Sequence, residues 1–265
     1  MNQRLPRRRT SIYLLPNLFT TGCLFAGFFA IVQAMHGRFT EAAIAIFVAM
    51  VLDSLDGRVA RLTNTTSDFG AQYDSLADMV AFGAAPALII YMWSLQSLGK
   101  FGWLAAFVYV AGAALRLARF NTNITIVDKR FFQGLPSPAA AALLAGLVWV
   151  ATDLRETRWI DYSAADLRWV SWAVAVYAGL SMVSSVPFYS FKDLNLRRSV
   201  PYAMIFLVAL GLVLISQDPP SLLFLLMLAY GLSGWLLFFW RKARGEKVEV
   251  FAESDQKPLK LLRFK

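Results

Sequence analysis

Four aspartates close together in the sequence are the residues best suited to chemistry. Asp53 and Asp56 stand three residues apart, and Asp74 and Asp78 stand four apart. Residues at these spacings share one face of a helix. Both pairs belong to apolar segments, where an ionisable side chain costs at least ~2.5 kcal/mol and usually marks a functional site. Converging carboxylates repel one another, and a hard divalent cation such as Mg²⁺, Mn²⁺ or Ca²⁺ would relieve that repulsion.

A structural alternative is that these acids form salt bridges between packed helices. Arg58 and Arg61 are their nearest basic neighbours in the sequence. Two bases are too few for four acids, and Gly57 and Gly70 stand where a ligand can approach the backbone closely. The pattern therefore favours a metal and ligand site.

The elements that must position these acids are membrane helices. The 265 residues are 58% hydrophobic and only 16% charged, against about 25% charged in soluble domains. Apolar runs of membrane-spanning length recur along the chain, so we expect a polytopic all-α bundle of about eight transmembrane helices. The predicted segments are 12–35, 39–62, 69–95, 101–120, 139–151, 169–188, 201–215 and 222–240. The fifth is short unless Pro136–Pro138 forms its first turn.

The net charge of +9 is concentrated beside the apolar segments, which favours an anionic membrane surface over nucleic acid as the partner. Lysine and arginine in short loops mark the cytoplasmic side. We therefore expect the inner (cytoplasmic) membrane, with both termini and the aspartates on the cytoplasmic side. Residues 1–265 would form a single membrane-embedded domain with a basic arm at 1–11 and a basic tail at 241–265. The basic start leads into a segment long enough to span, so no cleaved signal peptide is expected.

The acidic stretch matches the pattern D-x2-D-G-x2-A-R-x8-G-x3-D-x3-D without a gap or a substitution. The matching residues are Asp53, Asp56, Gly57, Ala60, Arg61, Gly70, Asp74 and Asp78. This pattern is the signature of the CDP-alcohol phosphatidyltransferases, and the chain resembles that family. The resemblance implies an enzyme that transfers the phosphatidyl group of CDP-diacylglycerol to an alcohol and releases CMP. It also implies a homodimer.

The same resemblance assigns roles to the acids. Asp53, Asp56 and Asp74 would be metal ligands, and Asp78 would be a ligand or the general base; we predict the base role for Asp78. The metal would be Mg²⁺ or Mn²⁺, with Ca²⁺ as an occupant in crystals. Two ions about 3.5–4 Å apart can clamp both ends of an in-line displacement.

A second group of residues is expected to bind the CDP-lipid. Small residues would let the nucleotide lie against the helices, Arg61 would fork onto phosphate oxygens, and the polar residues would donate hydrogen bonds. The predicted residues are Asn17, Gly57, Ala60, Arg61, Thr66, Ser67 and Gly70. Helix capping explains Asn17, Thr66 and Ser67 about as well.

Beyond the signature, the first half of the chain is similar to bacterial membrane-embedded members of the family that use L-serine. The similar stretches are 63–67, 74–78, 82–83, 86–87, 116–121 and 132–138. The carboxylate of L-serine would need cations near the acids. The predicted acceptor-binding residues are Arg116, Arg119, Asn121 and Gln133, whereas Lys129 and Arg130 are better explained as membrane anchors.

Two alternatives stay open. The same chemistry could use glycerol phosphate, inositol phosphate or choline as the acceptor. In a different class, the carboxylates could form the permeation site of a divalent-cation transporter. The expected position of the acids near one membrane surface counts against a transporter, because transporter sites usually lie at the midplane.

Overall fold

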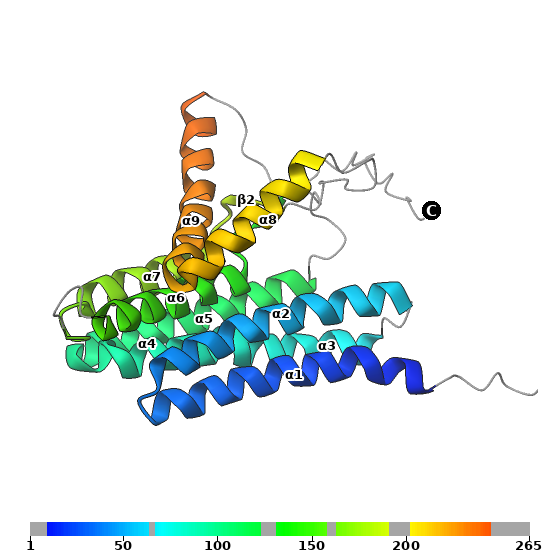
Figure 1. Ribbon diagram of the computed structural model, residues 1–265, viewed down its shortest axis with the longest axis horizontal. Helices are drawn as coiled ribbons and strands as arrows, with labels where there is room; N and C mark the ends of the chain where they lie inside the picture. The colour runs from blue at the N-terminus through cyan, green and yellow to red at the C-terminus, as the bar shows by residue number, and fades with distance from the viewer. Residues whose placement is uncertain (1–9, 64–66, 123–130, 158–162, 191–201, 245–265) are drawn as a thin grey trace, which may run out of the picture.

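The computed structural model describes residues 10–63, 67–122, 131–157, 163–190 and 202–244 (Figure 1). The long helices are α1 (Thr10–Met35), α2 (Phe39–Thr63), α3 (Asp68–Asp78), α4 (Ala85–Trp93), α5 (Lys100–Thr122), α6 (Ser137–Glu156), α7 (Arg168–Val183), α8 (Tyr202–Gln217) and α9 (Pro219–Ala243). A π-helix, η1 (Met79–Ala84), joins α3 to α4, and a 3-10 helix, η2 (Leu95–Leu98), follows α4. Two short strands, β1 (Phe131–Gln133) and β2 (Pro187–Tyr189), pair antiparallel.

Helices α1 to α7 run side by side, whereas α9 lies steeply across them and α8 leans away (Figure 1). The α1–α2 hairpin turns at Gly37, whose φ of 73° suits a residue without a Cβ. The end of α2 and the start of α3 meet at the end of the bundle from which α1 begins (Figure 1). The predicted third segment is confirmed as one helical stretch, Asp68–Trp93. The four aspartates are thereby brought to one end of the bundle.

Five helical segments of the described chain are long and apolar enough to cross a membrane, so this is an all-α membrane protein. They are Pro16–Met35, Asp68–Trp93, Lys100–Thr122, Ser137–Glu156 and Pro219–Ala243. The predicted count of about eight is not confirmed. Helix α2 has 25 residues but carries charged residues at both ends. Helices α7 and α8 have 16 residues each, fewer than the ~20 that span a bilayer.

Two predicted boundaries were wrong. Helix α6 begins at Ser137 with Pro138 in its first turn and runs to Glu156, so it is longer than the predicted 139–151 and enters the predicted loop. Helix α7 ends at Val183 rather than at Phe188. Pro187 disfavours helix in the residue before it, and the chain from there pairs as β2 with β1.

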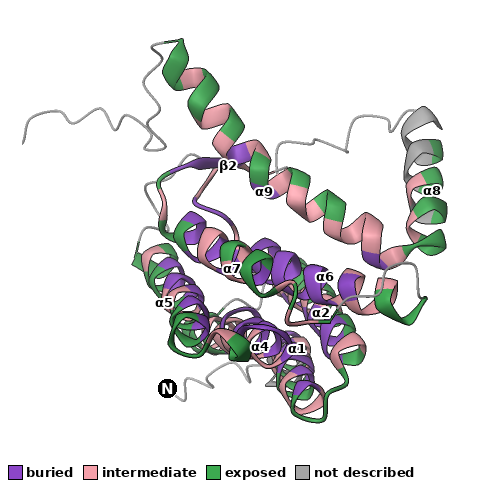
Figure 2. Cartoon of the chain, turned by 90° about the vertical axis from the view of Figure 1, so that its left-hand side faces the viewer, coloured by how far each residue is buried: buried purple, intermediate pink, exposed green. Residues whose placement is uncertain are grey.

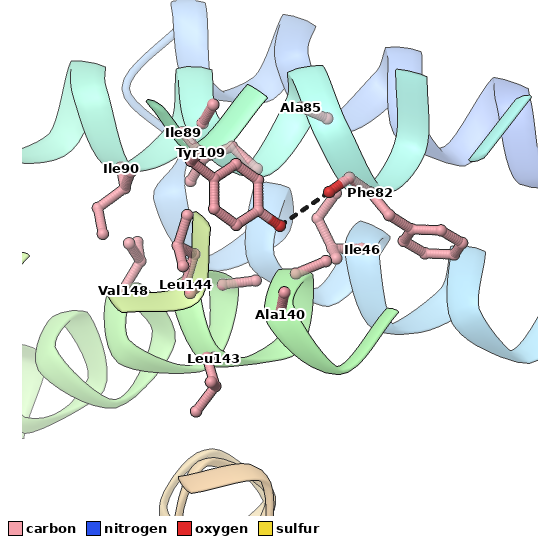
Figure 3. Close-up of a cluster of buried hydrophobic side chains, with 14 of the residues drawn as sticks. Ile46, Phe82, Ala85, Ile89, Ile90, Tyr109, Ala140, Leu143, Leu144 and Val148 are labelled. Atoms are coloured by element: carbon pink, nitrogen blue, oxygen red, sulfur yellow. Dashed lines mark hydrogen bonds between the residues drawn. The ribbon is translucent and has the colours of Figure 1, made fainter. Parts of the chain in front are cut away.

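The core lies between η1, α4, α5 and α6, and its side chains include Phe82, Ile89, Tyr109 and Leu144 (Figure 3). Helix α6 is the most enclosed, with buried residues on every side, whereas α9 buries only Pro220, Gly231 and Gly234 (Figure 2). Small residues let the backbones approach closely, as membrane helices prefer. A Cβ on Gly112, for example, would collide with the carbonyl oxygen of Gly179, so α5 and α7 pack backbone to backbone.

Candidate active site

Three of the predicted metal ligands form a compact group. Asp53 and Asp56 come from α2 and Asp74 from α3, and one carboxylate oxygen of each lies within 4.8 Å of the others. Oxygens bound to one Mg²⁺ or Ca²⁺ at ~2.0–2.6 Å can stand no more than about twice that distance apart. The group therefore fits the ligand shell of a hard divalent cation, and all three donors are of the type such a cation prefers.

Asp78 lies one helical turn beyond Asp74, outside this triad. Its carboxylate is close enough to interact electrostatically with Asp53, Asp74 and Arg116. Its Oδ1 is buried and has no hydrogen-bond partner within the described part of the chain. A buried oxygen without a partner is costly.

Helix α1 holds the two acidic helices in place through hydroxyl groups. Thr20 Oγ1 donates to Asp56 Oδ2 at 2.9 Å, and Thr21 Oγ1 lies 2.9 Å from the hydroxyl of Tyr73 on α3. Thr20 is buried together with Asp56. Sequence reasoning missed all of these partners; the signal was a pair of threonines, four residues after Pro16 and Asn17, on an otherwise apolar helix.

A cleft opens beside the triad between α1, α2 and the start of α3. Its lining consists of Pro16, Asn17, Thr20, Asp56, Gly57, Ala60, Arg61, Ser67, Gly70, Ala71 and Asp74. Six of the seven residues predicted for the CDP-lipid are in this lining, and the seventh, Thr66, lies outside the described residues. The structure thus gathers residues that are up to 53 positions apart in the sequence (Asn17 to Gly70) around one opening.

The glycines keep this cleft open. A Cβ placed on Gly57 would stand 3.5 Å from Nη1 of Arg61, so the guanidinium folds back over the glycine. A Cβ on Gly70 would stand 3.6 Å from Oδ1 of Asn17. Ser67 caps α3 by accepting a hydrogen bond from the Gly70 N–H at 3.1 Å. Larger residues at either glycine would narrow the space between the helices.

Arg116 is the predicted acceptor residue whose charge interacts with that of Asp78. It is buried, with 9% of its surface exposed. Its Nη1 donates to Ser137 Oγ at 2.9 Å, whereas its buried Nε has no partner among the described residues. Ser137, which sequence reasoning missed, opens α6 and so links the guanidinium to that helix.

The other predicted acceptor residues are engaged in different ways. Arg119 donates to the main-chain oxygens of Gln133, Met182, Val183 and Ser184. It thereby ties α5 to β1 and to the end of α7, whose last carbonyls need donors. Asn121 Nδ2 donates to Ser75 Oγ at 3.1 Å, between Asp74 and Asp78 in α3. Lys129 and Arg130 lie outside the described residues.

Comparison with known proteins agrees with this geometry. Residues 13–181 match the family described as CDP-alcohol phosphatidyltransferase. The chain is 36% identical to the CDP-diacylglycerol–serine O-phosphatidyltransferase of Helicobacter pylori over 85% of its length and 92% of that protein. It is 31% identical to the protein of the same name in Mycobacterium bovis, over 84% of this chain and 78% of that protein. It is 32% identical to the one in Methanocaldococcus jannaschii, over 71% of this chain and 80% of that protein. With its signature acids gathered in space and its sequence matched from α1 into α7, the chain belongs to the CDP-alcohol phosphatidyltransferase family.

Proposed function

We propose that this protein transfers the phosphatidyl group of CDP-diacylglycerol to the hydroxyl of L-serine, giving phosphatidylserine and CMP. The observation that carries the proposal is the carboxylate triad of Asp53, Asp56 and Asp74 at the edge of the cleft. The relatives that share most of the chain's length are named for this reaction.

The cleft would hold the CDP head group. Gly57 and Ala60 leave room beside α2, and Arg61 stands where it can form paired hydrogen bonds to phosphate oxygens. The N-terminus of α3, which lines the cleft with Ser67, Gly70 and Ala71, adds the positive end of its dipole. Asn17 and Ser67, with Thr66 beyond the described residues, would complete the polar contacts, while the acyl chains stay in the bilayer.

The triad would hold Mg²⁺ or Mn²⁺, and we propose two ions, with Asp78 available as a further ligand. Bound divalent metal supplies positive charge that neutralises the diphosphate and stabilises the departing CMP. The three carboxylates fix where that charge would lie, and Thr20 orients Asp56 by its hydrogen bond.

Asp78 would be the general base. The serine hydroxyl oxygen attacks the phosphorus that carries the diacylglycerol, and the bond between this phosphorus and the CMP oxygen breaks with both electrons going to CMP. The hydroxyl proton passes to the carboxylate of Asp78. Its buried Oδ1, which has no partner among the described residues, is the atom we assign to this step.

Arg116 would bind the carboxylate of L-serine. It is buried beside Asp78 and keeps Nε without a partner in the described part of the chain, and a guanidinium can pair with a carboxylate in a planar fork. Asn121 would reach the acceptor from its position at Ser75. Gln133 would act from β1, and Arg119 would act from the end of α5, where its guanidinium donates to the Gln133 main-chain oxygen.

The test offers the purified protein labelled CDP-diacylglycerol with L-serine, glycerol phosphate, inositol phosphate or choline in turn, and measures CMP. We expect Mg²⁺- or Mn²⁺-dependent CMP release with L-serine alone. CMP release only with another alcohol would show that L-serine is not the acceptor, while the phosphatidyl-transfer reaction would still hold. Divalent-ion flux in proteoliposomes without CMP release would instead support a transporter.

We also propose that the acids face the cytoplasm in the inner membrane and that the protein is a homodimer. The cytoplasmic side follows from the basic residues that flank the predicted segments on that side. A polar acceptor would then arrive from the cytosol. Labelling of a cysteine introduced at Ser67 by a membrane-impermeant reagent, in intact and in opened cells, tests the orientation.

A further inference from the structure

The helix that carries Asp74 and Asp78 changes its geometry immediately after Asp78. Residues Met79–Ala84 form a π-helix, in which the N–H of Ala85 bonds the carbonyl of Val80, five residues earlier. Such turns are rare and occur frequently at functional sites. Each residue contributes about 100° of rotation to an α-helix. Relaxation of the π-turn would therefore rotate Asp78 relative to α4 and to the acids of α2.

A tyrosine from another helix bonds this turn. Pro86 has no N–H, so the α-helical hydrogen bond to the carbonyl of Phe82, four residues earlier, cannot form. The hydroxyl of Tyr109 on α5 donates to that carbonyl oxygen at 2.8 Å (Figure 3). Tyr109 is completely buried, so water cannot replace its hydroxyl if it is lost.

Both partners of this hydrogen bond are held by close backbone packing. A Cβ on Gly179 of α7 would stand 2.9 Å from the Cα of Tyr109, which fixes the position of α5. In the turn itself, a Cβ on Gly27 of α1 would stand 2.6 Å from the Cα of Ala81. The π-turn therefore packs closely against both α1 and α5.

One face of α5 contacts both the π-turn and the candidate active site. Tyr109, Ala113 and Arg116 are spaced i, i+4 and i+7, so they lie on one helix face. Tyr109 bonds the Phe82 carbonyl, and the Ala113 Cβ would stand 3.4 Å from a Cβ on Gly83. Arg116 interacts with Asp78.

We propose that Tyr109 is a positioning residue for the reaction: its hydrogen bond to Phe82 holds the π-turn that aims the Asp78 carboxylate at the acid cluster. This rests on the proposed role of Asp78 as the base. Tyr109 is not part of the cleft lining, and it acts through the backbone that follows Asp78, where its hydroxyl donates to the Phe82 carbonyl. Loss of the hydroxyl would misplace the base without emptying the CDP-lipid cleft.

The test is Tyr109→Phe, with Tyr177→Phe as the matched control. Tyr177 also donates its hydroxyl to a main-chain oxygen, that of Gly231 at 2.7 Å, but it joins α7 to α9. We expect Tyr109→Phe to lower kcat by about 10- to 100-fold, as small misplacements of catalytic groups do. The KM for CDP-diacylglycerol should stay within about twofold, because the cleft does not involve α5. The control should keep both values.

A double variant separates positioning from general stability. The residual rate of Asp78→Asn should not fall further when Tyr109→Phe is added, because the base is already gone. Losses that multiply, a change in KM instead of kcat, or equal rates for Tyr109→Phe and Tyr177→Phe would overturn the proposal. Wild-type turnover by Asp78→Asn would instead overturn the base role on which the proposal rests.

A second pair of variants tests the role of the π-turn if Tyr109→Phe does not fold. Gly27→Ala pushes on the π-turn from α1, because its Cβ meets the backbone of Ala81. Gly22→Ala on the same helix meets only the Leu52 side chain, at 3.3 Å. A loss of kcat in Gly27→Ala but not in Gly22→Ala supports the role of the turn, and equal kcat in the two variants contradicts it.

Discussion

The two sides of the α1–α2 hairpin differ sharply: α1 and α2 line both, and the start of α3 completes only one of them. On one side lies the polar cleft with the acids. On the other lies an apolar groove lined by Gly22, Phe25, Ala26, Phe29, Glu41, Ile44, Ala45, Val48 and Leu52. Pro16 and Thr20 line the cleft, whereas Gly22 and Ala26 line the groove. Thr20 and Gly22 are two residues apart, so they lie on opposite sides of α1. A few polar residues on one face of each helix are therefore enough to form a polar site on a membrane hairpin.

The groove explains why most of this hairpin can be apolar. Phe25, Phe29 and Val48 are exposed there, which suits contact with lipid chains. Its one charged residue, Glu41, stands in the first turn of α2, at the opposite end of the helix from Asp53 and Asp56. If function resides in the cleft alone, the same substitution should have opposite consequences on the two sides.

The largest contrast should come from removing an acid on each side. Asp56→Asn should lower turnover by about 100-fold or more, since loss of a charge-assisted interaction of ~3 kcal/mol changes a rate by that factor. Glu41→Gln, the control on the same helix, should stay within about twofold. CMP release with L-serine measures both. Equal losses would mean that α2 acids matter for folding and not for the site.

Filling the cleft should have the next largest effect. Gly57→Val would add bulk where a Cβ meets only the Arg61 guanidinium, so the protein should fold while the substrate is hindered. A misfit of ~2 kcal/mol raises the KM for CDP-diacylglycerol about 30-fold. Gly22→Val, on the groove side, should leave the KM within about twofold. An unchanged KM for Gly57→Val would place the head group elsewhere.

The smallest effect should come from the hydroxyl that supports Asp56. Thr20→Val removes the 2.9 Å hydrogen bond to Asp56 Oδ2 and should weaken activation by Mn²⁺ about tenfold, as loss of a group that orients a metal ligand does. Thr152→Val, which removes only a bond to the Val148 carbonyl, is the control. A titration of activity against Mn²⁺ distinguishes them; matching curves would show that Thr20 does not orient Asp56.

Residues close in sequence were the easiest to place from the sequence. The i,i+3 spacing put Asp53 and Asp56 on one face of α2, and Asp74 of α3 lies beside them as expected. The partners that come from distant helices were missed, because the roles of Thr20, Ser137 and Tyr109 depend on which helices pack together.

The membrane segments were harder to predict. Hydropathy locates apolar stretches but not their direction, so the steep crossing of α9 could not be foreseen (Figure 1). Helix α6 begins shortly after β1 and α7 ends shortly before β2, and these two strands pair although their residues are more than 50 positions apart. The sequence predicted Arg119 as an acceptor-binding residue. In the structure its guanidinium also donates to main-chain oxygens of β1 and of the end of α7.

Crystals of the protein grown with Mn²⁺ and CDP-diacylglycerol would test the metal site most directly, through anomalous scattering at the manganese edge. The expected result is a peak bound by Asp53, Asp56 and Asp74 together, at ~2.0–2.4 Å from their oxygens, that disappears in Asp56→Asn. A nucleotide-bound structure whose only manganese peaks lie away from these three carboxylates would contradict the proposed metal site.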